Sequence, residues 1–275
     1  MSLKESLRTI RKKLRWLDPF TYVDLYVMPK INPYKNSTIE FAVNLFFAAF
    51  FAIAIYSIAG FLLSTDVPGA IVFSYSMLPV LSRGDFIALQ GVNAEQLNTP
   101  AVDLNFSVKD KHLKDYATTY CSFTESYGNP NELATCDSFL QLYIKQEIPI
   151  DSFTTRKIVF KNNQVLDLDT TGDITLYYSD LSGKQIIHRS VAKLNAEDGI
   201  FIFTKGDSPS NPIIDQDYPL SYENNAITSF ATPVSEIKGR IILRIPLIGY
   251  AKIIIFDDIP QLIFGCPEGQ ECYFP

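Results

Sequence analysis

The longest run of apolar residues lies in the first quarter of the chain. Residues 41–65 contain no Asp, Glu, Lys or Arg, and Glu40 and Asp66 flank them. At about 1.5 Å per residue, a helix of this length crosses a hydrocarbon core of about 30 Å. A buried core helix can show the same pattern, but a removable signal peptide begins closer to the amino terminus and carries a shorter apolar segment. We therefore predict a retained transmembrane helix over residues 41–65.

Short β-rich stretches replace this pattern in the rest of the chain. Turn-forming clusters such as Asn162-Asn163 and Ser182-Gly183 separate them. This spacing is typical of antiparallel hairpins, so we predict a mainly β fold after the membrane helix. The expected strands are 71–74, 85–90, 157–161, 165–168, 174–178, 185–189, 200–205 and 240–245.

Residues 93–150 differ from the stretches on either side of them. They contain polar loops, Cys121 and Cys136, and a short helical pattern near residues 138–146. We interpret them as an insertion or subdomain. The predicted organisation is a cytoplasmic arm (1–40), a transmembrane helix (41–65), a β-rich domain (66–92 and 151–256), the insertion (93–150) and a carboxyl-terminal tail (257–275).

Charge predicts the orientation of the chain in the membrane. Residues 1–40 carry eight basic and four acidic side chains, whereas residues 66–275 carry sixteen basic and twenty-six acidic ones. Because basic residues are retained on the inner side, we expect the amino terminus in the cytoplasm and the β-rich domain outside. The tail is interrupted by charges and prolines, so we expect a single pass with the carboxyl terminus outside. An amphipathic pattern in the arm predicts a short helix that lies on the inner leaflet or packs on protein; its apolar residues are Leu3, Leu7, Ile10, Leu14 and Leu17.

Composition narrows the classes of partner and cofactor. The net charge of −6 and the pI of about 5.0 argue against nucleic acid. The four cysteines all lie on the predicted outer side, where two disulfides can form; proximity favours Cys121–Cys136 and Cys266–Cys272, although three pairings are open. The chain lacks a CxxC pair and clustered histidines, so we expect no metal and no cofactor.

A candidate for nucleophilic chemistry follows the apolar run. Ser76 lies in the turn Ser74-Tyr75-Ser76-Met77-Leu78-Pro79, and His188 lies in a predicted strand. Asp207 and Asp215 come later in the chain. A serine, a histidine and an aspartate supply the nucleophile, the base and the group that orients the base in acyl transfer. Spacing alone is a weak indication, because many β domains contain these residues.

Four sequence blocks, taken in order, resemble the type I signal peptidases and within them the archaeal and endoplasmic-reticulum branch. The resemblance implies a signal-peptidase-type antiparallel β catalytic domain anchored by one amino-terminal transmembrane helix. The blocks are Ser74–Pro79 with Arg83-Gly84-Asp85, Ile187-His188-Arg189, Phe203-Thr204-Lys205-Gly206-Asp207 through Asp215, and Gly239-Arg240 with Pro246-Leu247-Ile248-Gly249-Tyr250.

The resemblance also implies a role for each candidate residue. Ser76 corresponds to the nucleophile, and Ser74 to the serine that helps the Ser76 N–H to hold the oxyanion. His188 corresponds to the general base. Asp215 matches the aspartate that orients the base, and Asp207 matches a supporting acidic position.

The chain departs from the family pattern at three places. Tyr75 replaces a small residue, Leu78 replaces a glutamate, and residues 208–210 lengthen the loop before Asp215. The longer loop leaves Asp217 as a rival to Asp215.

The function implied by the resemblance is the removal of signal peptides outside the cytoplasm, with cleavage after small residues such as alanine. The implied partners are precursor proteins that carry signal peptides, the lipid bilayer and the protein translocation channel. The cell membrane is the first expectation for location, and the endoplasmic reticulum is the second.

Two other functions stay open from the sequence. One is an inactive relative that acts as a membrane-anchored binding module. The other is a hydrolase with a serine–lysine pair, for which Lys205 or Lys193 would have to approach Ser76; the His188-Arg189 block argues against it.

Overall fold

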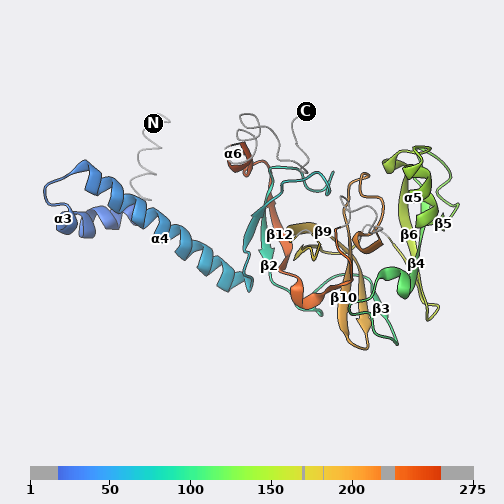
Figure 1. Cartoon of the computed structure of the whole chain (residues 1–275). Coiled ribbons are helices and arrows are strands. Elements are labelled where there is room, and N and C mark those ends of the chain that lie inside the picture. Colours follow the sequence, from blue (N-terminus) through green and yellow to red (C-terminus); the bar gives the residue numbers. More distant parts are fainter. Residues whose placement is uncertain (1–17, 169–170, 182, 218–226, 255–275) are drawn as a thin grey trace, which may run out of the picture. The chain divides into compact units, whose positions relative to one another are not determined.

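The structure is a computed structural model that describes residues 18–168, 171–181, 183–217 and 227–254. The chain divides into two compact units after Leu62. Figure 1 shows the helices of the first unit and the sheets of the second. The predicted amphipathic helix, the predicted tail and the Cys266–Cys272 pair lie outside the described residues.

The first unit is a helical hairpin. Asn32 closes its turn, because the Asn32 side chain donates to the Asn36 carbonyl at 2.8 Å and accepts from the Asn36 N–H at 2.7 Å. The rings of Phe20 and Phe51 meet edge to face with centroids 5.6 Å apart, so the first arm runs back along the second. The arms consist of α2 (Pro19–Tyr22), the π-helix η2 (Val23–Val27) and α3 (Met28–Ile31), and of α4 (Ser37–Leu63).

Helix α4 corresponds to the predicted membrane helix but begins and ends slightly earlier. Its start is set by Asn36, whose side-chain oxygen accepts from the backbone N–H of Thr38 at 2.9 Å and so caps the helix. None of its residues is buried, and apolar side chains cover all its sides. It is long and apolar enough to cross a membrane, which suggests that it anchors the chain; the described residues contain no second helix of this kind.

The second unit contains two β-sheets. The larger sheet has the strand order β1-β2-β12-β8-β9-β10-β11, with β3 paired to β9. Its pairs are antiparallel except for β3 with β9, so the predicted mainly antiparallel β fold is confirmed. The strands are β1 (Gly69–Ile71), β2 (Phe86–Gln90), β3 (Ala101–Asp103), β8 (Ile174–Tyr178), β9 (Gln185–Ala196), β10 (Gly199–Lys205), β11 (Thr232–Pro233) and β12 (Gly239–Ile245).

The smaller sheet has the order β5-β4-β6-β7 and is also antiparallel. It takes two strands from the predicted insertion 93–150 and two from the residues after it, so the insertion does not form a sheet by itself. A disulfide joins Cys121 to Cys136, the pairing that proximity favours. The elements are β4 (Ala117–Phe123), β5 (Ala134–Thr135), β6 (Phe153–Phe160), β7 (Val165–Asp167), α5 (Cys136–Ile144), η3 (Leu113–Asp115) and η4 (Ile150–Ser152).

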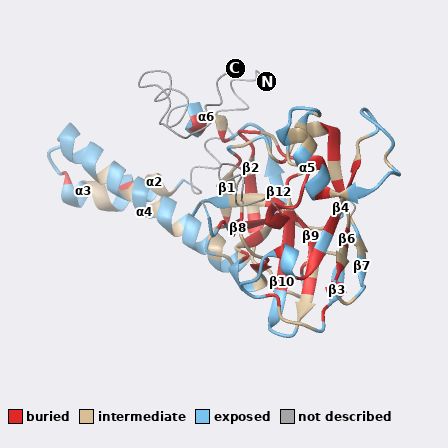
Figure 2. Cartoon of the chain, turned by 45° about the vertical axis from the view of Figure 1, so that its right-hand side comes forward, coloured by how far each residue is buried: buried red, intermediate tan, exposed pale blue. Residues whose placement is uncertain are grey.

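The largest hydrophobic core joins the two sheets. It combines Val191 and Phe203 of the larger sheet with Ile158 and Phe160 of the smaller one. The rings of Phe160 and Phe203 stack with centroids 6.5 Å apart. Figure 2 shows the buried residues concentrated along β9, β10 and the strands near them. The remaining described elements of the unit are η5 (Asp215–Asp217), η7 (Val234–Glu236) and α6 (Tyr250–Ile253).

Candidate active site

The candidate nucleophile Ser76 lies in a loop just after β1. The predicted strand 71–74 overlaps the observed strand only at Ile71, because β1 spans Gly69–Ile71 and residues 72–74 belong to the loop. Met77 anchors the loop in a core that also contains Val72 and Leu81. The hydroxyl oxygens of Ser74 and Ser76 are 3.0 Å apart and hydrogen-bonded. Ser76 itself is partly exposed.

The block Arg83-Gly84-Asp85 holds this loop in place. Arg83 is buried, and its Nε donates to the carbonyl of Phe73 at 3.2 Å. The buried Asp85 accepts from the N–H of Ser82 at 2.8 Å and pairs with Nε of Arg244 on β12 at 2.6 Å. These bonds fix the backbone on both sides of the two serines.

The serine loop meets the chain that leaves β10. The backbone N–H of Ser208 donates to the carbonyl of Ser76 at 2.9 Å. A Cβ atom on Gly206 would lie 2.6 Å from the same carbonyl oxygen, so this close approach requires glycine. Gly206 directly follows Lys205, which pairs with Arg189 on β9. His188 is the neighbour of Arg189 on β9. The register of β9 and β10, together with the contact of Gly206 with Ser76, therefore places the serine loop near this histidine.

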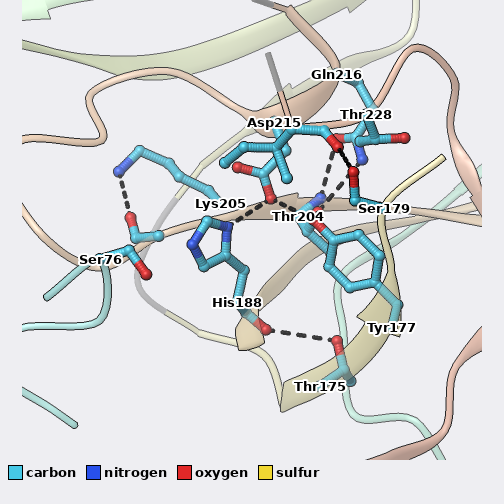
Figure 3. Close-up of polar contacts among 12 residues, drawn as sticks. Ser76, Thr175, Tyr177, Ser179, His188, Thr204, Lys205, Asp215, Gln216 and Thr228 are labelled. Atoms are coloured by element: carbon cyan, nitrogen blue, oxygen red, sulfur yellow. Dashed lines mark hydrogen bonds and ion pairs between the residues drawn. The ribbon is translucent and has the colours of Figure 1, made fainter. Parts of the chain in front are cut away.

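His188 and Asp215 form a buried pair. The distance from His188 Nδ1 to Asp215 Oδ2 is 2.7 Å, and the two side chains are 2% and 0% exposed. The backbone of His188 is fixed in the middle of the sheet, opposite Thr175 on β8. In Figure 3, Ser76 and Asp215 lie on either side of the imidazole ring. In the described residues, the Ser76 hydroxyl bonds to Ser74 and not to His188.

Tyr177 on β8 contacts the same carboxylate oxygen as His188. Its hydroxyl donates to Asp215 Oδ2 at 2.9 Å and accepts from Thr204 Oγ1 at 3.0 Å. Burial, together with the negative charge of Asp215, raises the pKa of Tyr177, so the phenol stays a donor at neutral pH. Gln216 extends the network, since its Nε2 donates to Thr204 Oγ1 at 3.3 Å. Sequence reasoning missed Tyr177, which looks like any aromatic residue of a core strand.

Asp207 supports the site through an ion pair. Arg189 donates to it through Nε at 2.8 Å and through Nη2 at 2.7 Å. The third guanidinium nitrogen of Arg189 donates to the carbonyl of Gly172 at 2.7 Å. Asp207 therefore holds the residue next to the candidate base and makes no hydrogen bond to His188.

Asp217 faces the smaller sheet. Its carboxylate accepts a buried hydrogen bond from the hydroxyl of Thr119 on β4. Burial raises the pKa of Asp217 to about 6, although the Thr119 hydrogen bond acts in the opposite direction. Of the three candidate aspartates, the structure brings only Asp215 into contact with His188.

The remaining candidates lie in other contacts. The amine of Lys205 donates to the Gly206 carbonyl at 3.0 Å, and that of Lys193 donates to the Ala94 carbonyl at 3.0 Å. Neither lysine is hydrogen-bonded to Ser76. The other histidine, His112, packs its ring against Phe230 with centroids 5.0 Å apart. The described residues contain no cluster of three or more acidic, histidine or cysteine side chains that could hold a metal.

Comparison with known proteins does not assign the chain to a family. No protein-family model matches the chain, and no curated protein is a significant match. The class is therefore defined by the fold and the candidate site alone: a mainly antiparallel β protein with a helix able to span a membrane, a buried histidine–aspartate pair, and a serine loop next to them.

Proposed function

We propose that this chain is a membrane-anchored serine endopeptidase, similar to the type I signal peptidases of the archaeal and endoplasmic-reticulum branch, that removes signal peptides from precursor proteins. The observation that carries the proposal is the 2.7 Å contact between His188 Nδ1 and Asp215 Oδ2. A buried carboxylate on Nδ1 selects the imidazole tautomer whose other nitrogen, Nε2, accepts a proton. That nitrogen is the one a general base uses against a serine hydroxyl.

In the proposed reaction, Ser76 attacks the carbonyl carbon of the scissile bond while His188 takes the hydroxyl proton. His188 then gives this proton to the leaving amine, and a water molecule hydrolyses the acyl-enzyme with the same histidine as base. For this step the Ser76 side chain rotates, so that its hydroxyl leaves the Ser74 hydroxyl and bonds to the His188 nitrogen. Catalytic hydrogen bonds often tighten only when substrate is bound.

The proposed oxyanion site consists of two donors on the serine loop. The hydroxyl of Ser74 is one donor, since it already lies at hydrogen-bond distance from the Ser76 hydroxyl. The backbone N–H of Ser76 is the other, because it donates to no acceptor within the described part of the chain. We expect Ser74→Ala to lower kcat by about 10²–10³, the usual cost of one oxyanion donor, with KM little changed. Equal kcat for Ser74→Ala and the unsubstituted enzyme would remove Ser74 from the oxyanion site.

The membrane contributes to the proposed function through concentration. An anchor in the same bilayer as the precursor raises the effective concentration of enzyme and substrate without a new contact. Helix α4 supplies that anchor in the proposal. The proposed location is the cell membrane, with the amino terminus in the cytoplasm and the β-rich unit outside, and the endoplasmic reticulum is the second choice.

The test is cleavage of a purified secretory precursor by the full-length protein in liposomes. We expect one cut after a small residue, and we expect Ser76→Ala and His188→Ala to abolish it. Thr175→Ser serves as the control, because it changes a buried side chain next to His188 and keeps its hydroxyl. An intact precursor in the presence of folded, unsubstituted protein would contradict the proposal.

One observation favours a second candidate, an inactive relative that binds a partner at the membrane. The Ser76 hydroxyl bonds to Ser74 and not to His188. In this second candidate, Tyr75 and Leu78 are departures from the peptidase sequence pattern that followed a loss of activity. The same experiment separates the two, since the binding module leaves every precursor intact and its Ser76→Ala variant behaves like the unsubstituted chain.

A further inference from the structure

We propose that Lys205 is a positioning residue of the candidate site: its ammonium group provides the counter-charge of the buried His188–Asp215 pair and lowers the pH at which His188 becomes a neutral base. The kinetic consequence rests on the proposed function, whereas the electrostatic coupling itself does not.

Lys205 lies where β10 meets the serine loop. It is the last residue of β10, and its partner across the sheet is Arg189, the neighbour of His188. Its amine donates to the carbonyl of Gly206 at 3.0 Å. Gly206 in turn lies against the carbonyl of Ser76. The amine therefore occupies the junction of β10 with the serine loop, and Figure 3 shows it extending toward the Ser76 side of the imidazole.

The buried charge of Asp215 is not balanced by its hydrogen-bond donors. Its side chain is 0% exposed, and its hydrogen-bond donors, Tyr177 and His188, are neutral when the histidine is ready to act as a base. Its other oxygen, Oδ1, receives no donor from the described residues. A buried carboxylate is costly unless a cation lies near it. The site therefore needs a positive charge that the hydrogen bonds do not supply.

The neighbouring cations have other partners. Arg189 is held by both oxygens of Asp207 and by the carbonyl of Gly172. Arg156 on β6 donates through Nε to the hydroxyl of Ser122 at 3.2 Å. Lys205 donates only to a neutral carbonyl within the described structure, and the negative charges that act on its amine are Asp215 and, with a smaller effect, Asp207.

The titration of Lys205 agrees with this assignment. Burial lowers the pKa of Lys205 to about 8, against the opposing effects of Asp215 and Asp207, and Arg156 lowers it further. The amine is therefore mostly protonated at pH 7 and loses its charge as the pH rises through about 8. A cation at this place disfavours a second positive charge on His188, so removal of the cation favours the imidazolium form.

The experiment follows the two histidine rings of the full-length protein by nuclear magnetic resonance in detergent, with ¹³C at Cε1. The chain contains only His112 and His188, and a His112→Gln variant assigns the signals. We expect Lys205→Met to move the midpoint of the His188 titration upward by about 0.5 to 1 pH unit, and Lys205→Arg to move it by much less. Lys193→Met is the matched control, because Lys193 also donates to a backbone carbonyl of the same unit.

One measurement needs no variant at position 205. As Lys205 loses its proton in the unsubstituted protein, the His188 signal should show a second inflection near pH 8. The proposal is overturned when this inflection is absent or when Lys205→Met and Lys193→Met shift the midpoint equally. These readouts use no substrate, so a protein that cleaves no precursor refutes the peptidase proposal without deciding the role of Lys205. In an active enzyme, the acid limb of kcat/KM should move with the midpoint.

Discussion

At the scale of single residues, the hydroxyl of Tyr177 contacts the same carboxylate oxygen of Asp215 as His188 does. Tyr177→Phe removes one of the donors to Asp215 Oδ2 and leaves Thr204 without its acceptor. We expect kcat to fall about tenfold with KM nearly unchanged, and the free energy of unfolding to fall by about 1–3 kcal/mol. Steady-state kinetics and thermal unfolding measure the two effects.

The control for this variant is Tyr178→Phe. Tyr178 is adjacent in sequence but 44% exposed, and its hydroxyl accepts from Gln185 at 2.9 Å. It should lose neither activity nor stability. Comparable losses in both variants would mean that Tyr177 has no special relation to Asp215.

Asp217 should make the stability of the fold depend on pH. Burial raises the pKa of Asp217 from its ordinary value of 3.8 to about 6. Ionisation of Asp217 is thus less favourable in the folded chain than in the unfolded chain. The contribution of Asp217 to stability is therefore fully present below about pH 4 and is lost as the pH rises toward 6. Asp217→Asn keeps an acceptor for Thr119 and removes this titration.

The measurement is thermal unfolding of both proteins between pH 4 and 7. Relative to the unsubstituted chain, we expect Asp217→Asn to gain up to about 3 kcal/mol over this range. A constant difference between the two proteins would show that Asp217 titrates normally.

At the residue scale, the sequence predicts candidates for the groups that take part in the reaction, but it does not predict the residues that position those groups. Ser76, His188 and Asp215 could be proposed because the sequence blocks around them resemble those of a known family. Tyr177 could not, because a tyrosine in a strand has the pattern of an ordinary core residue and its contact with Asp215 joins residues 38 apart in sequence.

At the scale of elements, the smaller sheet holds the segment that carries Asp215. The hydroxyl of Thr155 on β6 donates to the Pro212 carbonyl at 3.3 Å. Ile213 packs in one core with Cys121 and Cys136. The disulfide, which joins β4 to the first residue of α5, therefore stabilises the structure around the candidate orienting residue.

Removal of the disulfide tests this support. We expect Cys121→Ala with Cys136→Ala to lower the free energy of unfolding by about 3 kcal/mol, since the bond closes a loop of about 15 residues, and to lower kcat as well. A reductant should weaken the unsubstituted protein in the same way and the double variant less, since only Cys266 and Cys272 remain in the double variant. Unchanged kcat in a less stable double variant would mean that Asp215 is held without this cluster.

The elements also show where sequence patterns are sufficient. Alternating β-rich runs predict most strands of the larger sheet, and proximity predicts the Cys121–Cys136 bond. The pairing of β4 with β6 is not predictable, because β4 is not among the expected strands and the predicted boundary at residue 150 separates it from β6. The start of α4 was placed too late because Ser37, Thr38 and Glu40 are polar, whereas the Asn36 cap extends the helix through them.

At the scale of the whole molecule, charge and α4 together predict one orientation in the membrane. We expect the full-length protein to resist alkaline extraction from membranes. A protease added to sealed, right-side-out vesicles should digest the acidic β-rich unit and spare α4. Digestion of that unit only after the vesicles are opened would reverse the orientation.

The central claim is that the His188–Asp215 pair drives the chemistry at Ser76. Its most direct test is precursor cleavage by full-length Asp215→Asn, Asp207→Asn and Asp217→Asn compared in parallel. We predict that Asp215→Asn lowers kcat by about 10⁴, because the imidazole takes the wrong tautomer, whereas the other two lose no more than about tenfold. A large loss at Asp217 alone, with Asp215→Asn still active, would contradict the account.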